Sequence, residues 1–253
     1  MSKALTNELI QSNGLIIEGL KRLYRLNVGE RLYDLEFTSP YRLTIGGETV
    51  ETVAWGELLV KTVLILLDMY PGRESQLLSF KTDWSNAAMF SEKNRTNFAQ
   101  LKEGVYININ HTSLHSCWFL YDLLEWFEVN YSKCDFLIHR MPKAEPKEIR
   151  DAIRSDVKAA LKDFLIWKKL LPADKAEKQI KNLEFLNKKF KEMRSTSGYD
   201  DLFLFDDLNF YSNAKSKFIS DLKSKVFSTE PKKVEICRRC LDYLTDFYPT
   251  YKY

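Results

Sequence analysis

The sequence predicts an α+β protein: a small mixed sheet with a βαβ unit and covering helices, followed by a basic α-helical bundle. Three observations lead to this prediction. Apolar and polar residues alternate in short runs before residue 140, and a strand, a helix and a strand follow one another at 105–139. Beyond residue 145 the apolar residues recur only with helical spacing. We therefore expect a sheet domain at 1–144 and a helical domain at 145–253.

The first part of the chain is predicted to contain one helix and a short meander. An amphipathic apolar pattern indicates a helix over 5–26, although Gly14 lies in its middle. Period-two alternation then predicts strands at 33–37 and 41–45. A Gly-Gly turn leads from the second strand to a third at 50–53, as in a hairpin.

The next part is predicted to hold a buried helix and a βαβ unit. Residues 54–70 form an apolar-rich helix that Pro71 ends. A half-buried strand at 105–110, a helix at 114–129 and a second strand at 134–139 then follow. A strand, helix and strand this close together predict parallel strands joined by a right-handed crossover.

Four helices are predicted in the last hundred residues, separated by Pro172, a Ser-Gly segment at 195–198 and Pro231. Their apolar stripes are Ile149, Ile153, Val157, Leu161 and Phe164; Ala176, Ile180, Leu183 and Phe190; Tyr211, Ala214, Phe218 and Leu222; and Val234, Cys237, Leu241, Leu244 and Tyr248. Residues 141–200 carry 15 Lys and Arg against 10 Asp and Glu. Such a basic half suits phosphate binding, and it equally suits a solvated Lys/Glu helix surface.

The sequence favours a cytoplasmic location. Its N-terminus lacks the basic, apolar and cleavage regions of a signal peptide. The longest apolar run, 58–70, is interrupted by charges and is too short to span a membrane. Four scattered cysteines form no disulfide framework, as expected in a reducing compartment.

One candidate binding site follows from the strand alternation. If the apolar side chains of all predicted strands face the helices, their polar neighbours share the opposite face. That face could bind a metal or a polar ligand, or could simply be solvated. Its members would be Asp34, Glu36, Arg42, Thr44, Tyr106, Asn108, Asn110, Asp135 and His139.

A metal-dependent nuclease of the restriction-enzyme type is an alternative. In that arrangement two carboxylates hold Mg²⁺ and a lysine positions the attacking water. Asp135, Glu145 and Lys147 have the required residue types, but Pro146 stands where the motif needs a central-strand residue. No cofactor is expected outside this alternative.

The histidines and cysteines have simpler structural explanations. His111 and His115 are four residues apart but lack the glutamate of the HExxH zinc motif. Cys237 and Cys240 form C-R-R-C within a predicted helix, so core packing is expected, with Arg238 and Arg239 adding positive charge to the opposite surface. The sequence contains no GxGxxG, no P-loop and no GxSxG elbow, which disfavours nucleotide hydrolysis and serine hydrolase chemistry.

Three segments resemble a module of uncharacterised bacterial proteins associated with restriction and phage-defence genes. They are ETVAWGELLVKTVLILLDMYP, LKEGVYININHTSLHSCWFLYDLLEWFEV and CDFLIHR, and the matching residues are Trp55, Gly104, Tyr106, Asn110, Leu123 and Leu124. The tail CRRCLDYLTDFY similarly resembles the helix that closes several such proteins. The resemblance covers about half of the chain. It implies a prokaryotic, cytosolic protein that acts beside a nuclease or nucleic acid, and it transfers no catalytic residue.

These observations favour a non-catalytic binding or accessory protein of an antiphage defence system. We expect a protein partner, with nucleic acid as a second kind of partner, and no membrane association. The binding candidates are the polar face together with Arg238 and Arg239. The nuclease described above and a purely structural subunit are the competing hypotheses.

Overall fold

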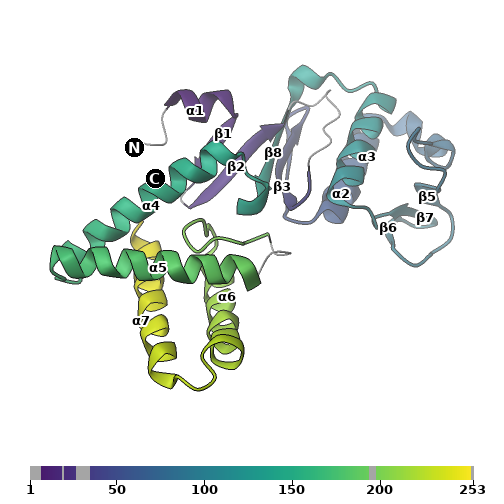
Figure 1. Ribbon diagram of the computed structural model, residues 1–253. Coiled ribbons are helices and arrows are strands. Elements are labelled where there is room, and N and C mark those ends of the chain that lie inside the picture. The colour runs from purple at the N-terminus through teal and green to yellow at the C-terminus, as the bar shows by residue number, and fades with distance from the viewer. Residues whose placement is uncertain (1–6, 19, 27–34, 194–197, 252–253) are drawn as a thin grey trace. The chain divides into compact units, whose positions relative to one another are not determined.

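The computed structural model describes residues 7–18, 20–26, 35–193 and 198–251. Contacts divide the chain into two compact units (Figure 1). The sheet unit is Leu23–Arg140, and the helical unit joins Met1–Arg22 to Met141–Tyr253. The α+β class is confirmed. The predicted domain boundary at residue 144 stays a prediction. The contacts place the segment Met1–Arg22 in the same unit as the later helices.

The larger sheet has five strands in the order β1-β2-β8-β3-β4. They are β1 (Leu15–Glu18), β2 (Lys21–Leu26), β8 (Cys134–Arg140), β3 (Thr38–Ile45) and β4 (Glu48–Glu51). Strand β8 pairs antiparallel with both β2 and β3. Its central residues Phe136, Leu137 and Ile138 are fully buried, so apolar residues lie on both faces of this strand.

Helix packing on this sheet begins with α2 (Trp55–Met69), against which α3 (Ser113–Trp126) packs in turn. Helix α2 contacts β3, β4 and α3, and the Trp55 ring meets Phe136 edge-on at 5.9 Å. Thr112 caps α3 by accepting a hydrogen bond from the His115 backbone at 3.3 Å. Both predicted helices are confirmed.

The predicted βαβ unit is wrong. Strand β7 (Val105–Asn108) belongs to a second sheet, between β5 (Phe90–Ser91) and β6 (Phe98–Lys102), while β8 lies in the larger sheet. The strand, helix and strand are all present, but the two strands are not neighbours. Period-two alternation fixes which side chains share a face of one strand, and it does not specify the partner strand.

The predicted helix over 5–26 is also wrong beyond its first turns. Helix α1 ends at Ser12 (Asn7–Ser12), and Gly14 then adopts φ 59°, a left-handed conformation typical of helix ends. The following residues form β1 and β2 because pairing with β8 outweighs their local helical spacing.

The first predicted strand of the meander is wrong where it is described. Residues 33 and 34 lie outside the described part, and Glu36 and Phe37 form a turn in which Phe37 has φ 56°. Strand β3 confirms the second predicted strand. Its pairing register with β8 shifts between Pro40 and Arg42, where an irregularity accommodates the proline. Strand β4 confirms the third at Val50.

The four predicted helices of the helical unit are confirmed. They are α4 (Lys147–Trp167), α5 (Ala173–Met193), α6 (Leu208–Asp221) and α7 (Pro231–Phe247). Helix α5 contacts α4 and α7, and α6 contacts α7 (Figure 1). A π-turn, Leu222–Val226, extends α6, and the short 3-10 turns are Pro71–Ser79, Tyr131–Lys133, Pro142–Ala144 and Tyr248–Thr250. Among the described helices, none has both the length and the apolar character required to cross a bilayer.

Candidate functional site

The predicted polar face is divided between two sheets, so it does not form a single site. The register places Thr44 opposite Asp135 and His139 opposite Ser39, on the same face of the larger sheet as Arg42. Tyr106 and Asn108 are on β7 of the smaller sheet, Asn110 follows that strand, and Glu36 lies in a turn. Asp34 lies outside the described residues. The prediction of one shared face is therefore wrong.

The part of the face that does assemble is occupied by contacts within the sheet. Arg25 Nε donates to Asp135 Oδ1 at 2.8 Å, and the hydroxyls of Thr44 and Thr49 lie 3.1 Å apart. Leu137 alternates onto this same face and is fully buried. Within the described residues, no three His, Cys, Asp or Glu side chains are grouped so that they could hold a metal ion.

The residues of the nuclease alternative have separate surroundings. Asp135 belongs to the sheet unit and pairs with Arg25. Glu145 belongs to the helical unit and pairs with Arg22 Nε at 2.5 Å, and both of these side chains are fully buried. Lys147 is exposed at the first residue of α4. Each carboxylate thus has an arginine partner, and the nuclease itself stays an untested prediction.

The two histidines pack into an aromatic cluster at the start of α3. The His115 ring stacks on Trp84 with centroids 5.0 Å apart and an interplanar angle of 4°. His111 precedes the helix and meets Trp84 edge-on at 5.8 Å. Burial lowers the pKa of His111, assisted by the nearby His115 charge, while a backbone hydrogen bond at Asn108 opposes this effect. The arrangement is one of packed rings.

A buried charged cluster within the described residues was not predicted from the sequence. Residues 198–206, here called the buried acidic loop, are all buried, and they include Asp200, Asp201 and Asp206. Tyr199 Oη donates to Asp206 Oδ1 at 2.7 Å, and burial together with the Asp206 charge raises the pKa of Tyr199. Gly198 fits closely here, because an added Cβ would collide with the Met141 side chain.

Arg22 connects the N-terminal segment to this loop inside the helical unit. Besides its pair with Glu145, its Nη2 donates to the Leu204 carbonyl at 2.7 Å and lies 3.9 Å from Asp206 Oδ2. The Arg22 side chain is fully buried, so these contacts replace its lost hydration. Arg22 therefore holds together segments separated by more than 120 positions in the chain.

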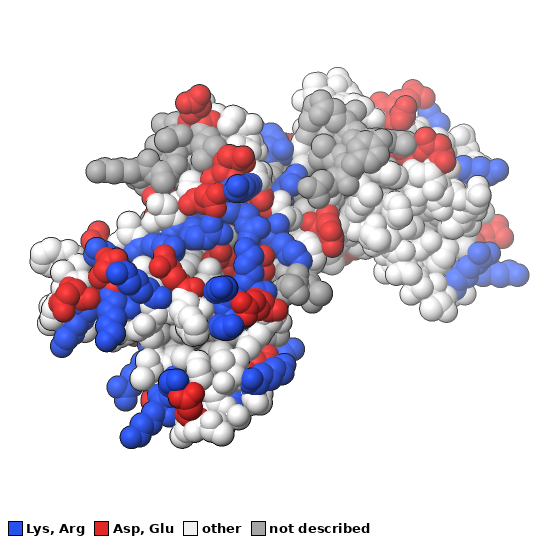
Figure 2. Space-filling model, viewed as in Figure 1, with Lys and Arg blue, Asp and Glu red and all other residues white. Residues whose placement is uncertain are grey.

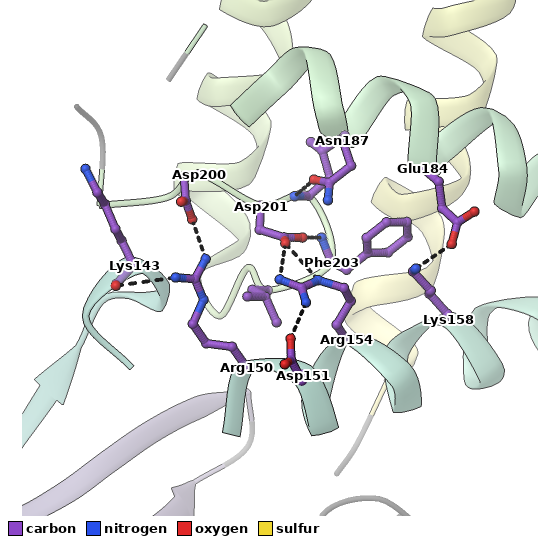
Figure 3. Close-up of polar contacts among 12 residues, drawn as sticks. Lys143, Arg150, Asp151, Arg154, Lys158, Glu184, Asn187, Asp200, Asp201 and Phe203 are labelled. Carbon is purple, nitrogen blue, oxygen red and sulfur yellow. Dashed lines mark hydrogen bonds and ion pairs between the residues drawn. The ribbon is translucent and has the colours of Figure 1, made fainter. Parts of the chain in front are cut away.

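A row of cations on α4, here called the charge ladder, makes further contacts with the loop and with α5 (Figure 3). Arg150, Arg154, Lys158 and Lys162 recur every four residues and lie on one face of the helix. They pair in order with Asp200, Asp201, Glu184 and Glu177 at 2.9, 2.7, 2.5 and 2.6 Å. The first two acids are almost fully buried and the last two are about half exposed.

The charge ladder pairs four of the 15 Lys and Arg residues at 141–200 with acids. Figure 2 shows acidic side chains interspersed with basic ones over the helical unit. Because the four cations of the ladder have carboxylate partners, they would have to break those pairs before contacting phosphates. The structure therefore gives less support to a nucleic-acid surface on this face of α4 than the sequence did.

A shallow apolar groove lies between α5 and α7. Its hollow measures about 160 Å³ and its lining residues are Asn182, Phe185, Leu186, Phe227, Lys233, Ile236, Cys237 and Cys240. Phe185 and Ile236 are 50% and 55% exposed, whereas the two cysteines are buried, which confirms the predicted core position of Cys237. Burial raises the pKa of Cys240 to about 11, so this thiol is a poor nucleophile at neutral pH. Arg238 and Arg239 are exposed on α7, as predicted.

The comparisons with known proteins are negative: no family model, no curated protein and no solved structure matches this chain. Candidate functions must therefore be argued from the geometry. The buried acidic loop and the charge ladder are internally paired and stabilise the helical unit. The α5–α7 groove combines a hollow with exposed apolar side chains, and it is the described feature best suited to binding another molecule.

The sequence could have shown one of these features but not the others. The four-residue spacing of the ladder cations is visible in the sequence, although their acidic partners are not. The groove depends on the packing of α5 against α7, so no local pattern indicates it. Arg22 lies within the range predicted as a helix over 5–26, and its role requires the β2 strand that the sequence did not predict.

Proposed function

We propose that this chain is a non-catalytic accessory protein that binds a protein partner through the α5–α7 groove of its helical unit. The observation that carries the proposal is the exposure of Phe185 and Ile236 on either side of an apolar hollow. Large apolar side chains at such a site lose contact with water only when a partner covers them. Aromatic anchors beside a pocket are typical of binding hot spots.

A protein partner is better supported than nucleic acid. The groove lining is mainly apolar, with Leu186, Cys237 and Cys240 beside the exposed anchors, and such a hollow suits an apolar side chain inserted by a protein. The most regular basic row of the unit, the charge ladder, has acidic partners. The resemblance to proteins associated with phage defence extends the proposal to a setting: we place the partner among the components of a prokaryotic antiphage defence system.

Co-purification from prokaryotic cells tests the proposal. Tagged wild-type protein is compared with the double variant F185S/I236S after nuclease treatment, and bound proteins are quantified by mass spectrometry. We expect a partner that survives nuclease treatment and falls at least about tenfold with the groove variant, as for loss of two hot-spot anchors. The control variant V53S/L78S removes exposed apolar side chains from the sheet unit and should retain the partner. Equal retention by both variants would refute the proposal.

A further inference from the structure

The size of the α5–α7 groove limits what can occupy it. Its volume of about 160 Å³ is below the roughly 300–1,000 Å³ of sites that enclose a whole small-molecule ligand. A hollow of this size suits one large side chain supplied by another molecule. Phe185 on α5 and Ile236 on α7 would cover that side chain from either side, because both line the hollow and both are about half exposed.

Most of the residues that flank the two exposed side chains along their helices are basic. On a helix, the surface neighbours of a residue are the positions three and four away. For Phe185 these positions are Lys181, Asn182, Lys188 and Lys189, and for Ile236 they are Lys232, Lys233, Arg239 and Cys240. Six of the eight are basic and none is acidic. Three of the six form ion pairs with nearby acids, Lys189 with Glu192, Lys233 with Glu230 and Arg239 with Glu235. Lys181 and Lys188 lie within electrostatic reach of Glu177 and Glu192. The surface beside the groove therefore carries acids as well, with the bases in excess.

We propose that the α5–α7 groove binds an acidic segment of the partner protein, which inserts an aliphatic or aromatic side chain between Phe185 and Ile236. This inference rests on the proposed function and adds the chemistry of the partner. An apolar anchor with carboxylates on either side matches an apolar hollow with cations on either side. The carboxylates increase the rate of association and select the partner, and the anchor supplies most of the binding energy.

A second copy of the chain fits this groove less well. A symmetric dimer places the same patch of each subunit against the other, so Lys181 and Lys188 would face like charges. Repulsion between closely apposed like charges opposes such an interface. An acidic partner gains favourable charge interactions from the same lysines, which are exposed.

An unbiased selection tests the chemistry of the partner. A display library of random 16-residue peptides is selected on the intact wild-type chain and counter-selected on F185S/I236S. We expect the enriched peptides to carry a net negative charge, with Asp or Glu within four positions of a Leu, Ile, Phe or Trp. Enrichment of neutral or basic peptides that still require Phe185 and Ile236 would overturn the acidic partner and leave the proposed function standing. If no peptide distinguishes wild type from F185S/I236S, the groove itself fails as a docking site.

Binding measurements on one enriched peptide separate the two contributions. By fluorescence anisotropy, F185S/I236S should weaken binding at least about 30-fold and K181E/K188E about tenfold, typical of hot-spot and charge contributions. The matched control K175E/K191E reverses charges on the same helix away from Phe185 and should change the affinity less than about threefold. Equal effects of the two charge reversals would overturn the local role of Lys181 and Lys188. A single-stranded DNA or RNA probe that binds more tightly than the peptide and depends on the same residues would replace protein with nucleic acid.

Discussion

Replacing Arg22 with methionine should destabilise the helical unit strongly, because Arg22 joins strand β2 to Glu145 and to the buried acidic loop. The substitution keeps the length and apolar stem of the side chain but removes the guanidinium. Glu145 would lose its partner at 2.5 Å, and the Leu204 carbonyl would lose a donor at 2.7 Å. Both side chains of the ion pair are fully buried, so water cannot replace the lost contacts without a structural opening.

The expected loss of unfolding free energy follows from the burial of the Arg22–Glu145 pair. Removing one partner of a buried ion pair typically costs about 3–5 kcal/mol, because it leaves an uncompensated charge. Arg25 provides a matched control on the same strand. Its pair with Asp135 has nearly the same length, 2.8 Å, but its side chain is 59% exposed and that of Asp135 is 35% exposed. An exposed pair contributes about 0.2–1 kcal/mol, so Arg25→Met should cost no more than about 1 kcal/mol.

Equilibrium unfolding in urea, followed by far-UV circular dichroism, measures both effects. For a chain of this size the loss at Arg22 corresponds to a melting temperature lower by about 6–20 °C, against at most about 4 °C for Arg25→Met. In the double variant R22M/E145L two apolar side chains replace the pair, so much of the lost stability should return. The reasoning is refuted if R22M costs no more than R25M, or if R22M/E145L is less stable than R22M.

Three further predictions concern the charge ladder, the glycine of the buried loop and the aromatic cluster. Arg154→Ala should lower the free energy of unfolding by about 1–3 kcal/mol, because its partner Asp201 is almost fully buried. Lys162→Ala should lower it by less than about 1 kcal/mol, because its partner Glu177 is half exposed. Equal losses in urea titrations would contradict this order. Gly198→Ala should cost about 1–3 kcal/mol through its clash, while Gly72→Ala, with open space around its Cα, should be tolerated in the same assay. The His111 ring should titrate below the ordinary pKa of 6.5 in an NMR pH series. Its contribution to stability should be lost as the pH falls below 6.5, because the unfolded chain takes up the proton before the folded chain does. A titration midpoint at or above 6.5 would contradict the burial argument.

The parts of the fold that could be predicted are those that local sequence determines. Helices α2, α4, α5 and α7 each carry an apolar stripe with helical spacing, and proline stands at or beside the end of α2, the start of α5 and the start of α7. Strand β8 was predicted from its alternation. Its central run of three buried residues reflects a position inside the sheet, with strands on both sides.

The errors arose where long-range pairing decides the structure. The apolar spacing of residues 16–23 fits a helix, but residues 16–18 and 21–23 belong to β1 and β2, and β2 pairs with β8 more than a hundred positions away. Similarly, β7 alternates as a half-buried strand should, yet it joins the smaller sheet. The prediction of one shared polar face was wrong for the same reason. Asn108 and His139 each lie on a strand with alternating apolar and polar residues, but the two strands belong to different sheets.

The buried acidic loop shows why the charged core could not be predicted. Its sequence, GYDDLFLFD, contains three acids and follows a Ser-Gly segment, so it has the composition of a surface connection between helices. Those acids are buried because arginines from β2 and α4 are within reach of them. A single carboxylate without such partners would be too costly to bury. The partners come from two distant segments, and only the folded chain brings them together.

The cations of residues 141–200 include two groups that should respond differently to salt. Arg150 and Arg154 of the ladder face almost fully buried acids at short distances, where added ions screen weakly, so the helical unit should keep most of its stability as salt rises. Lys181 and Lys188 are exposed beside Phe185, where a partner's carboxylates would be screened strongly. An acidic partner in the α5–α7 groove should therefore bind less tightly in high salt while the melting temperature of the chain barely changes. If added salt lowered the free energies of binding and of unfolding by the same amount, the weaker binding would follow from a less stable helical unit. The distinction between the ladder cations and the exposed Lys181 and Lys188 would then be wrong.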